Sequence, residues 1–258
     1  RKLGPVTHAV ITVPAYFDER RRQATVNAGK LAGLNVLDIL NEPTAAAIAY
    51  GFHRGFLKHG NGDAEKAIRI LVYDLGGGTF DVTLMEIKGD HFQTLATDGD
   101  VKLGGRDWDE KLVNLIAERF IREHREDPRQ NQESLYELYR AAETAKRTLS
   151  EREQALVVIS HVGTRFKTTV TRADFEAATA TLLNRTRITT EIVLQHSKLA
   201  WKDIDRVLLV GGSSRMPMVA KMLQQVTGQE PDRSVSPDDA VAQGAALFAD
   251  LAIQKRGL

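Results

Sequence analysis

One order of expected elements occurs twice in the chain, at residues 8–50 and again at residues 206–249. Each time a short apolar strand leads through a Pro-containing turn into a helix, and an X-Pro pair then precedes a helix of small residues. Alternating strands and helices are typical of an α/β fold, so we predict an α/β protein with a weak internal duplication. The expected strands are residues 8–13, 36–40 and 206–210, and the expected helices are residues 18–31, 43–50 and 217–226, with a last helix capped by residues 236–239.

A β meander and a helical insertion are expected between the two copies. The meander precedes the second copy only, which predicts that a first meander has been cut off. Residues 51–67, rich in Gly, His and charge, predict a surface connection with a boundary near residue 65. Thr171 and Asp174 form a capping box before a long helix. The other expected elements are strands at residues 69–74, 79–87, 91–97, 155–160 and 165–170, helices around residues 112–121 and 135–149, and a polar loop at residues 127–134.

The composition is that of an ordinary globular protein and excludes several classes of function. The 258 residues are 42% hydrophobic and 27% charged, and the formal net charge of +1 provides no long-range field for nucleic acid or an anionic membrane. No apolar stretch reaches the ~18 residues of a membrane span, which predicts a soluble protein. The absence of cysteine excludes disulfides and Cys-ligated zinc and suits a reducing compartment. Because the chain begins at Arg1, we expect a piece of a longer protein.

The segment DLGGGTFD at residues 74–81 is the sharpest local signal for chemistry. Three glycines allow several backbone N–H groups to converge on a phosphate, and Thr79 adds a hydroxyl donor. Asp74 and Asp81 at the two ends can hold Mg²⁺ through its water molecules. A glycine-rich hairpin without a ligand explains the three glycines equally well, but the two flanking carboxylates favour the phosphate site.

Three further features have both a functional and a structural explanation. The turn GGSSR at residues 211–215 follows an apolar strand and offers N–H groups, hydroxyls and a planar cation that can stack on a base, yet it also suits an ordinary strand-to-helix turn. Glu42 precedes Pro43, where a carboxylate is favoured by the helix dipole alone. A stripe of polar residues on the helix around Ala141 suits a solvated salt-bridge face. The stripe comprises Arg140, Glu143, Lys146, Arg147 and Ser150.

Several other sites are excluded by their missing motifs. The sequence has no P-loop, no dinucleotide fingerprint G-x-G-x-x-G, no H-E-x-x-H zinc motif and no G-x-S-x-G nucleophile elbow. Lys102 breaks the EF-hand pattern that Asp98 and Asp100 would begin. The seven histidines are scattered, which favours core or surface roles over metal binding.

Six segments occur in a fixed order: residues 11–17 (ITVPAYF), 41–47 (NEPTAAA), 74–81 (DLGGGTFD), 103–109 (LGGRDWD), 145–150 (AKRTLS) and 210–217 (VGGSSRMP). Together they closely resemble the 70-kDa heat-shock chaperones of the DnaK type, over nearly the whole chain. The resemblance implies the actin-like ATPase (ribonuclease H-like) fold, whose two lobes close on ATP or ADP, Mg²⁺ and, in family members, K⁺. It implies that lobe II is complete with a helical/β insertion and that lobe I is only partly present. The implied domains are residues 1–64 (C-terminal part of lobe I), residues 65–103 and 181–258 (base of lobe II) and residues 104–180 (insertion of lobe II).

The resemblance also implies the residues of a nucleotide site. The purine is expected between Arg147 and Arg215, and Pro14 stands at the place of the family's allosteric proline. The phosphate loop is Gly76, Gly77, Gly78 and Thr79, and the acids that order the waters around Mg²⁺ and the attacking water are Glu42, Asp74 and Asp81, which with Thr79 form the catalytic set. The nucleoside side is Gly211, Gly212, Ser213, Arg215 and Asp238, together with Glu143, Lys146, Arg147 and Ser150.

The sequence departs from the family pattern in two ways. Asp18 and Glu19 stand where Asn-Asp is usual, and Arg106 and Trp108 stand where Glu and Phe are common, which predicts altered coupling between the lobes. The first phosphate loop, D-x-G-T-T-x-S, is missing, together with the lysine of lobe I that assists hydrolysis, the interdomain linker and the peptide-binding domain.

The resemblance implies the ATP-binding portion of a cytoplasmic stress-response chaperone, whose ATP hydrolysis gates the binding and release of unfolded peptides by an absent domain. J-domain cochaperones and nucleotide-exchange factors are the implied partners, and neither nucleic acid nor a membrane is expected. The chain itself is expected to bind nucleotide weakly and to hydrolyse ATP poorly, because half of the charged groups are missing. The alternative is an actin-like filament or scaffold protein controlled by nucleotide, against which VPAYF and NEPTAAA argue. A sugar kinase of the same superfamily is a third alternative, which is disfavoured because the sequence shows no recognisable sugar-site acid.

Overall fold

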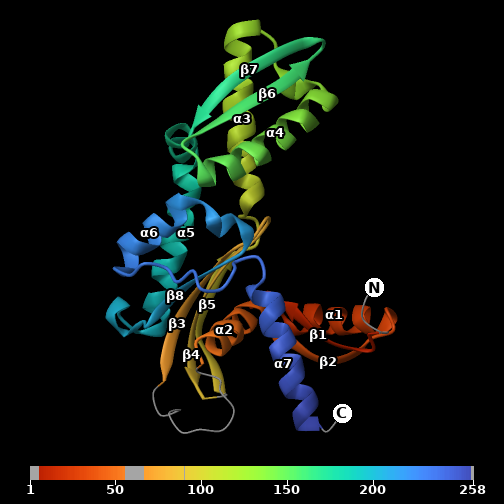
Figure 1. The fold of residues 1–258 in the computed structure, drawn as a ribbon, viewed down its shortest axis with the longest axis vertical. Coiled ribbons are helices and arrows are strands. Elements are labelled where there is room, and N and C mark those ends of the chain that lie inside the picture. The colour runs from red at the N-terminus through yellow and green to blue at the C-terminus, as the bar shows by residue number, and fades with distance from the viewer. Residues whose placement is uncertain (1–5, 56–66, 90, 257–258) are drawn as a thin grey trace.

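The computed structural model describes residues 6–55, 67–89 and 91–256, which form a mixed α/β molecule with three sheets (Figure 1). The parallel pair β1–β2 lies near the N-terminus, the four-stranded sheet has the order β5-β4-β3-β8, and β6–β7 is an antiparallel ribbon. The strands are β1 (His8–Val13), β2 (Asn35–Asn41), β3 (Ile68–Leu75), β4 (Phe80–Lys88), β5 (His91–Asp100), β6 (Gln154–His161), β7 (Thr164–Thr171) and β8 (Arg206–Val210). The α-helices are α1 (Glu19–Leu31), α2 (Glu42–His53), α3 (Gly105–His124), α4 (Gln132–Glu151), α5 (Arg172–Ser197), α6 (Pro217–Thr227) and α7 (Ala240–Arg256). Short 3₁₀ turns are η1 (Pro128–Gln130), η2 (Trp201–Asp203) and η3 (Gly212–Arg215).

The four-stranded sheet is the centre of the molecule and confirms the predicted antiparallel meander. β4 pairs antiparallel with both β3 and β5, while β8 adds to the other edge of β3 in parallel. Leu71 and Tyr73 of β3 face the core shared with α3–α6, whereas Ile70 and Val72 face the core shared with α2. This alternation follows from the two-residue period of a strand and shows why β3 is apolar on both faces.

The two predicted copies share a feature in the structure: in each, the first strand pairs in parallel with the segment that follows its helix. In the first copy β1 pairs in parallel with β2, and in the second copy β8 makes a parallel bridge from Leu208 to Asp232. The small-residue helices α2 and α7 then pack against each other (Figure 1). A Cβ added to Gly244 of α7 would lie 1.7 Å from the carbonyl oxygen of Ala45 in α2, so only glycine permits this crossing. The expected cap of α7 is a turn in which the Ser236 carbonyl accepts from the Ala240 N–H at 2.9 Å.

The predicted insertion stands apart from the central sheet, with α3, α4, β6 and β7 in the upper part of Figure 1. α5 runs from this insertion back to the sheet (Figure 1), and it begins with the predicted capping box: the Asp174 N–H donates to Thr171 Oγ1 at 3.1 Å and the Thr171 N–H to Asp174 Oδ2 at 3.0 Å. The polar loop was predicted too long, because the Asn131 side chain caps α4 and makes residues 132–134 helical.

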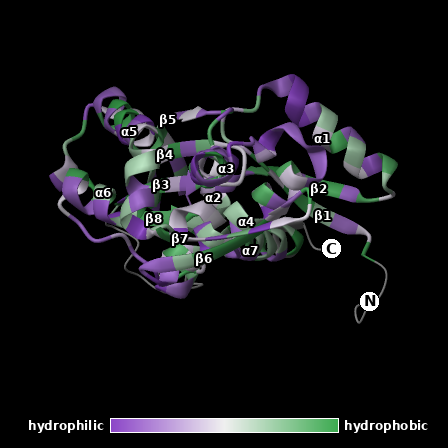
Figure 2. Ribbon diagram, turned by 90° about the horizontal axis from the view of Figure 1, so that it is seen from above, coloured by the Kyte–Doolittle hydropathy of each residue, from purple (hydrophilic) through white to green (hydrophobic). Residues whose placement is uncertain are grey.

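The remaining features of the N-terminal part of the chain are the end of α2 and the character of α1. The predicted connection at residues 51–67 starts too early, since α2 continues to His53, and residues 56–66 lie outside the described residues. The outer helix α1 is mostly hydrophilic (Figure 2), and Gly29 is its buried residue. No helix of the described part of the chain is long and apolar enough to cross a membrane.

Candidate functional site

Three carboxylates lie within electrostatic reach of one another at one end of the central sheet. Asp74 near the end of β3 and Asp81 near the start of β4 are direct cross-strand partners, and Glu42 is the first residue of α2. Burial raises the pKa of Asp74 to about 7, with contributions from Glu42 and Asp81, and burial and Glu42 raise the pKa of Asp81 to about 7. Burial also raises the pKa of Glu42. None of the three forms an ion pair within the described part of the chain, so the cluster lacks a counter-cation.

Tyr16 belongs to the same neighbourhood, which sequence reasoning did not find. Burial raises the pKa of its hydroxyl, and the negative charges of Asp81 and Glu42 raise it further. Tyr16 is one of the two aromatic residues of the VPAYF segment, but nothing in that segment alone relates it to residues 42 and 81. Only the fold brings the segment after β1 to the acids.

The three-glycine turn is anchored on one side and open on the other. The Gly76 N–H donates to the Thr79 carbonyl at 3.0 Å, and the Gly76 carbonyl accepts from the Gly105 N–H at 2.9 Å. A Cβ on Gly104 would lie 2.4 Å from the nitrogen of Gly78, so the start of α3 presses directly on the turn. These contacts hold the turn against the base of the insertion.

The open side of the turn suits an anion. A Cβ on Gly77 or Gly78 would meet no atom within 4 Å, and neither backbone N–H donates a hydrogen bond within the described residues. Two glycine amides that donate no hydrogen bond among the described residues, beside carboxylates that lack a cation, fit a phosphate bound together with a divalent cation. Among the described residues no three His or carboxylate side chains are placed to ligate a metal directly, so Mg²⁺ held through water stays a prediction.

The second glycine turn joins this region to α4. Gly211 has a φ of 80°, and a Cβ there would lie 2.6 Å from Asp74 Oδ1. A Cβ on Gly105 would lie 2.3 Å from Ser213 Oγ and 3.1 Å from Lys146 Nζ, so the glycine turn and the polar stripe of α4 meet at Gly105. This convergence brings together two groups of residues that are far apart in the sequence.

Lys146 forms a nearly buried ion pair with Asp109, which was not predicted from the sequence. Its ammonium group lies 2.8 Å from Asp109 Oδ1 and donates to the Gly105 carbonyl at 3.0 Å, and both side chains are nearly buried, at 12% and 11% exposure. Burial raises the pKa of Asp109, and the hydrogen bond and charge of Lys146 oppose that rise. The interpretation of the whole stripe as a solvated face is therefore wrong for Lys146, since Asp109 from α3 covers it.

The two arginines expected to hold the purine are both exposed and paired. Arg147 Nη2 donates to Glu143 Oε1 at 2.5 Å, and Arg215 Nη2 donates to Asp238 Oδ2 at 2.6 Å. Their side chains are 77% and 52% exposed. Ser150 Oγ donates to the Lys146 carbonyl of its own helix at 3.1 Å. The structure brings Lys146 and Ser213 together but gives no direct contact between Arg147 and Arg215, so the purine sandwich stays a prediction.

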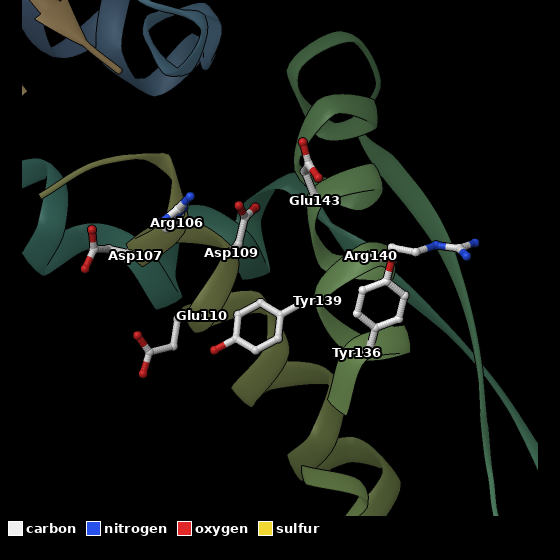
Figure 3. A pocket seen from close by; sticks show the side chains of 8 residues that line it. All are labelled: Arg106, Asp107, Asp109, Glu110, Tyr136, Tyr139, Arg140 and Glu143. Atoms are coloured by element: carbon white, nitrogen blue, oxygen red, sulfur yellow. The ribbon is translucent and has the colours of Figure 1, made fainter. Parts of the chain in front are cut away.

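A cavity of about 530 Å³ lies between α3 and α4 next to this region (Figure 3). Glu143 is the residue that it shares with the predicted nucleoside side, and Figure 3 shows Tyr139 between the two helices. The side chains of Tyr136 and Tyr139 are exposed, and their spacing of three residues gave no functional signal. The cavity is lined by Arg106, Asp107, Asp109, Glu110, Tyr136, Tyr139, Arg140 and Glu143.

Comparison with known proteins gives a consistent result. The sequence profile of the Hsp70 protein family matches residues 2–256. The chain is 46% identical over 254 residues to the chaperone protein DnaK of Metamycoplasma hominis, covering 96% of this chain and 41% of that protein. It is 47% identical over 259 residues to DnaK of Deinococcus deserti (97% and 40%). It is 48% identical over 248 residues to heat shock cognate 70 kDa protein 3 of Dictyostelium discoideum (95% and 38%). The chain thus spans about two fifths of the length of these relatives.

Proposed function

Because the chain belongs to the Hsp70 family, which has the actin-like ATPase fold, we propose that it is the ATP-binding portion of a chaperone whose ATP hydrolysis gates the binding and release of unfolded peptides. The observation that carries the proposal is the pair Asp74 and Asp81 beside two free glycine amides, because this arrangement suits the charged end of a magnesium nucleotide. The family match favours the chaperone over a filament or scaffold protein.

On the phosphate side, the amides of the glycine turn and the Thr79 hydroxyl would hold the phosphate oxygens. Mg²⁺, when bound, neutralises phosphate charge, which is the main requirement of phosphoryl transfer. Glu42, Asp74 and Asp81 would hold the waters of the ion and orient the attacking water by accepting hydrogen bonds. Their raised pKa values support this role, since a nearby cation would restore the ionised form that accepts such bonds.

On the nucleoside side, the purine would lie between the guanidinium groups of Arg147 and Arg215. Stacking of planar cations on both faces of a base is favourable and leaves the edge of the base for hydrogen bonds. The approach of Lys146 and Ser213 to the same residue, Gly105, supports a common site for the two elements. The proposed nucleoside contacts are Gly211, Gly212, Ser213, Arg215 and Asp238 with Glu143, Lys146, Arg147 and Ser150.

The remaining proposals concern the domains of the chain, a second cation, the partner proteins and the cellular compartment. We divide the chain into residues 1–64, residues 65–103 with 181–258, and residues 104–180, as parts of lobe I, the base of lobe II and its insertion. We assign K⁺ as a second cation, J-domain and nucleotide-exchange cochaperones as partners, and the cytoplasm as the compartment. The chain alone should bind nucleotide weakly and hydrolyse ATP poorly, because it spans only about two fifths of the length of its relatives.

The proposal is tested by titration calorimetry with Mg·ADP and with magnesium pyrophosphate. The chain should bind both, and Arg215→Ala should weaken ADP binding by about tenfold while leaving pyrophosphate unchanged, because the arginine contacts only the base. Arg187→Ala is the matched control, since Arg187 also forms one solvent-accessible ion pair, with Glu191 at 2.6 Å, but on α5. No measurable binding of either ligand would refute the proposal.

A further inference from the structure

A polar network ties the C-terminal end of α2 to the segment that follows α6. Arg54, the residue after α2, donates to Asp232 Oδ2 at 2.7 Å. The Tyr50 hydroxyl donates to the same oxygen at 3.3 Å and accepts from Arg206 Nε at 3.2 Å. The guanidinium of Arg54 also lies over the Tyr50 ring, 5.7 Å from its centre. One carboxylate oxygen is thus shared by two side chains of the α2 end.

Asp232 is itself fixed to the central sheet. Its N–H donates to the Val207 carbonyl at 2.8 Å, and it forms the parallel bridge with Leu208 of β8. Its Oδ1 accepts from the Ser234 N–H at 2.8 Å, and its side chain is 11% exposed. Burial acts to raise the pKa of Asp232, but the hydrogen bonds from Ser234 and Arg54 outweigh it and hold the pKa below its usual range. Asp232 is therefore a fixed, ionised anchor on the edge of β8.

α2 carries one acid of the candidate site, and the sheet to which Asp232 is fixed carries the other two. α2 begins at Glu42, about 18 Å along the helix axis from Arg54 at about 1.5 Å per residue. β8 pairs with β3 so that Val210 lies opposite Asp74. A shift of α2 along β3 and β8 would therefore move Glu42 relative to Asp74.

The close crossing of α2 with α7, where Gly244 meets Ala45, resists such a shift on one side of the helix, and the network at Asp232 resists it on the side of the sheet. The surface of α2 that faces β3 is made of alanines and Tyr50, packed on Ile70 and Val72. Small apolar side chains interlock weakly, and sliding of packed elements over such surfaces is a known form of protein motion. The directional contacts at Asp232 give the helix a defined position along its axis.

We propose that Asp232 is a positioning residue that acts through Arg54 and Tyr50 to set Glu42 against Asp74 and Asp81 for the binding of the magnesium nucleotide. The role in binding rests on the function proposed above. The position of α2, in contrast, is a property of the chain alone. The two parts can therefore be tested by separate measurements on the same variants.

The binding part is tested with Arg54→Ala, Asp232→Ala and the double variant, each titrated with Mg·ADP and with ADP in EDTA. Each single variant should weaken Mg·ADP by about fivefold and ADP without magnesium by less than about twofold, because Glu42 acts through the ion. The double variant should be no weaker than either single variant, and Arg54→Lys should recover part of the affinity. Glu86→Gln is the matched control, since it breaks the 3.0 Å Arg69–Glu86 pair of β3 and β4 without touching α2.

The positional part is tested by amide hydrogen exchange along α2, without nucleotide. Loss of protection in both single variants over residues 46–49 as well as 50–53 supports the proposal, because the whole helix is then released. Loss confined to residues 50–53, or an equal weakening of ADP with and without magnesium, overturns it. If the parent chain binds no Mg·ADP, the proposed function fails, and the exchange pattern alone decides whether Asp232 positions α2.

Discussion

The phosphate side and the nucleoside side of the candidate site differ in whether their charged side chains are paired with an opposite charge. Glu42, Asp74 and Asp81 are close together without a cation, and two of them have pKa values raised to about 7. On the nucleoside side every predicted cation has a carboxylate partner: Lys146 has Asp109, Arg147 has Glu143 and Arg215 has Asp238. Repulsion between the carboxylates therefore destabilises the first region, whereas in the second region each cation is already paired with a carboxylate before any ligand binds.

This difference predicts which mutations affect folding and which affect binding. Ligand binding on the phosphate side relieves repulsion, so loss of an acid should stabilise the chain and abolish magnesium binding. On the nucleoside side the exposed pairs contribute little to folding, because solvent screens them, while the buried pair contributes through the cost of an unpaired charge.

The largest effect is expected for Lys146→Met, which removes one partner of the buried pair. Asp109 would then be an uncompensated carboxylate at 11% exposure, and the free energy of unfolding should fall by about 3 kcal/mol. Urea unfolding followed by circular dichroism measures this change. The double variant with Asp109→Leu should recover most of the stability, and an equal loss in the double variant would show that the packing of Lys146, not its charge, is responsible.

A somewhat smaller effect is expected for Gly104→Ala, which tests the attachment of α3 to the glycine turn. The new methyl group would lie 2.4 to 2.6 Å from backbone atoms of Gly78, which cannot move without displacing the turn. We expect a loss of about 2 kcal/mol, measured by thermal unfolding. Gly77→Ala is the control, since its methyl group meets open space and should leave stability unchanged while weakening pyrophosphate binding. Equal stability of the two variants would contradict the close packing.

The elements of the fold were largely predictable because their signals are local. The strand at His8–Val13 and the capping box of Thr171 and Asp174 were found from a few neighbouring residues, and both are confirmed. The meander placed Asp74 and Asp81 at the two ends of one turn, so their pairing across β3 and β4 is a direct consequence of the glycines.

The contacts of the site were less predictable because they join distant segments. Lys146 and Asp109 are on different helices, and no spacing rule relates them. The approach of Gly104 to Gly78 likewise depends on how the insertion leaves the sheet. Sequence reasoning named the residues of two glycine turns and one polar stripe, but only the packing shows that Gly105 is where they meet.

The next largest effect on stability is expected for Asp81→Asn on the phosphate side, and this variant should be more stable than the parent chain, not less stable. The pKa of Asp81 is raised from 3.8 to about 7 in the folded chain, so between these values the folded state binds more protons than the unfolded state. Stability therefore falls as the pH rises from about 4 to about 7 and stays low above that range. Asp81→Asn removes the charge and should stabilise the chain by about 1 kcal/mol at pH 8 and hardly at all at pH 4.

Thermal unfolding at the two pH values, with and without saturating Mg·ADP, measures the Asp81→Asn effect. Without ligand the variant should have the higher midpoint at pH 8. With ligand the order should reverse, because the parent chain gains binding energy that the variant has lost. A variant that is less stable than the parent chain at pH 8 without ligand would mean that Asp81 is not under electrostatic strain.

The smallest effect on stability is expected for Arg147→Ala, next to Lys146 in the chain. The Arg147–Glu143 pair is 77% and 50% exposed, so its loss should change the free energy of unfolding by less than about 0.5 kcal/mol. The affinity for Mg·ADP should nevertheless fall by about fivefold, since a cation over the purine is lost. Arg140→Ala, on the same helix beside the cavity, should change neither quantity. If Arg147→Ala also left ADP affinity unchanged, charge pairing on the nucleoside side would serve folding alone, and the contrast with the phosphate side would lose its functional meaning.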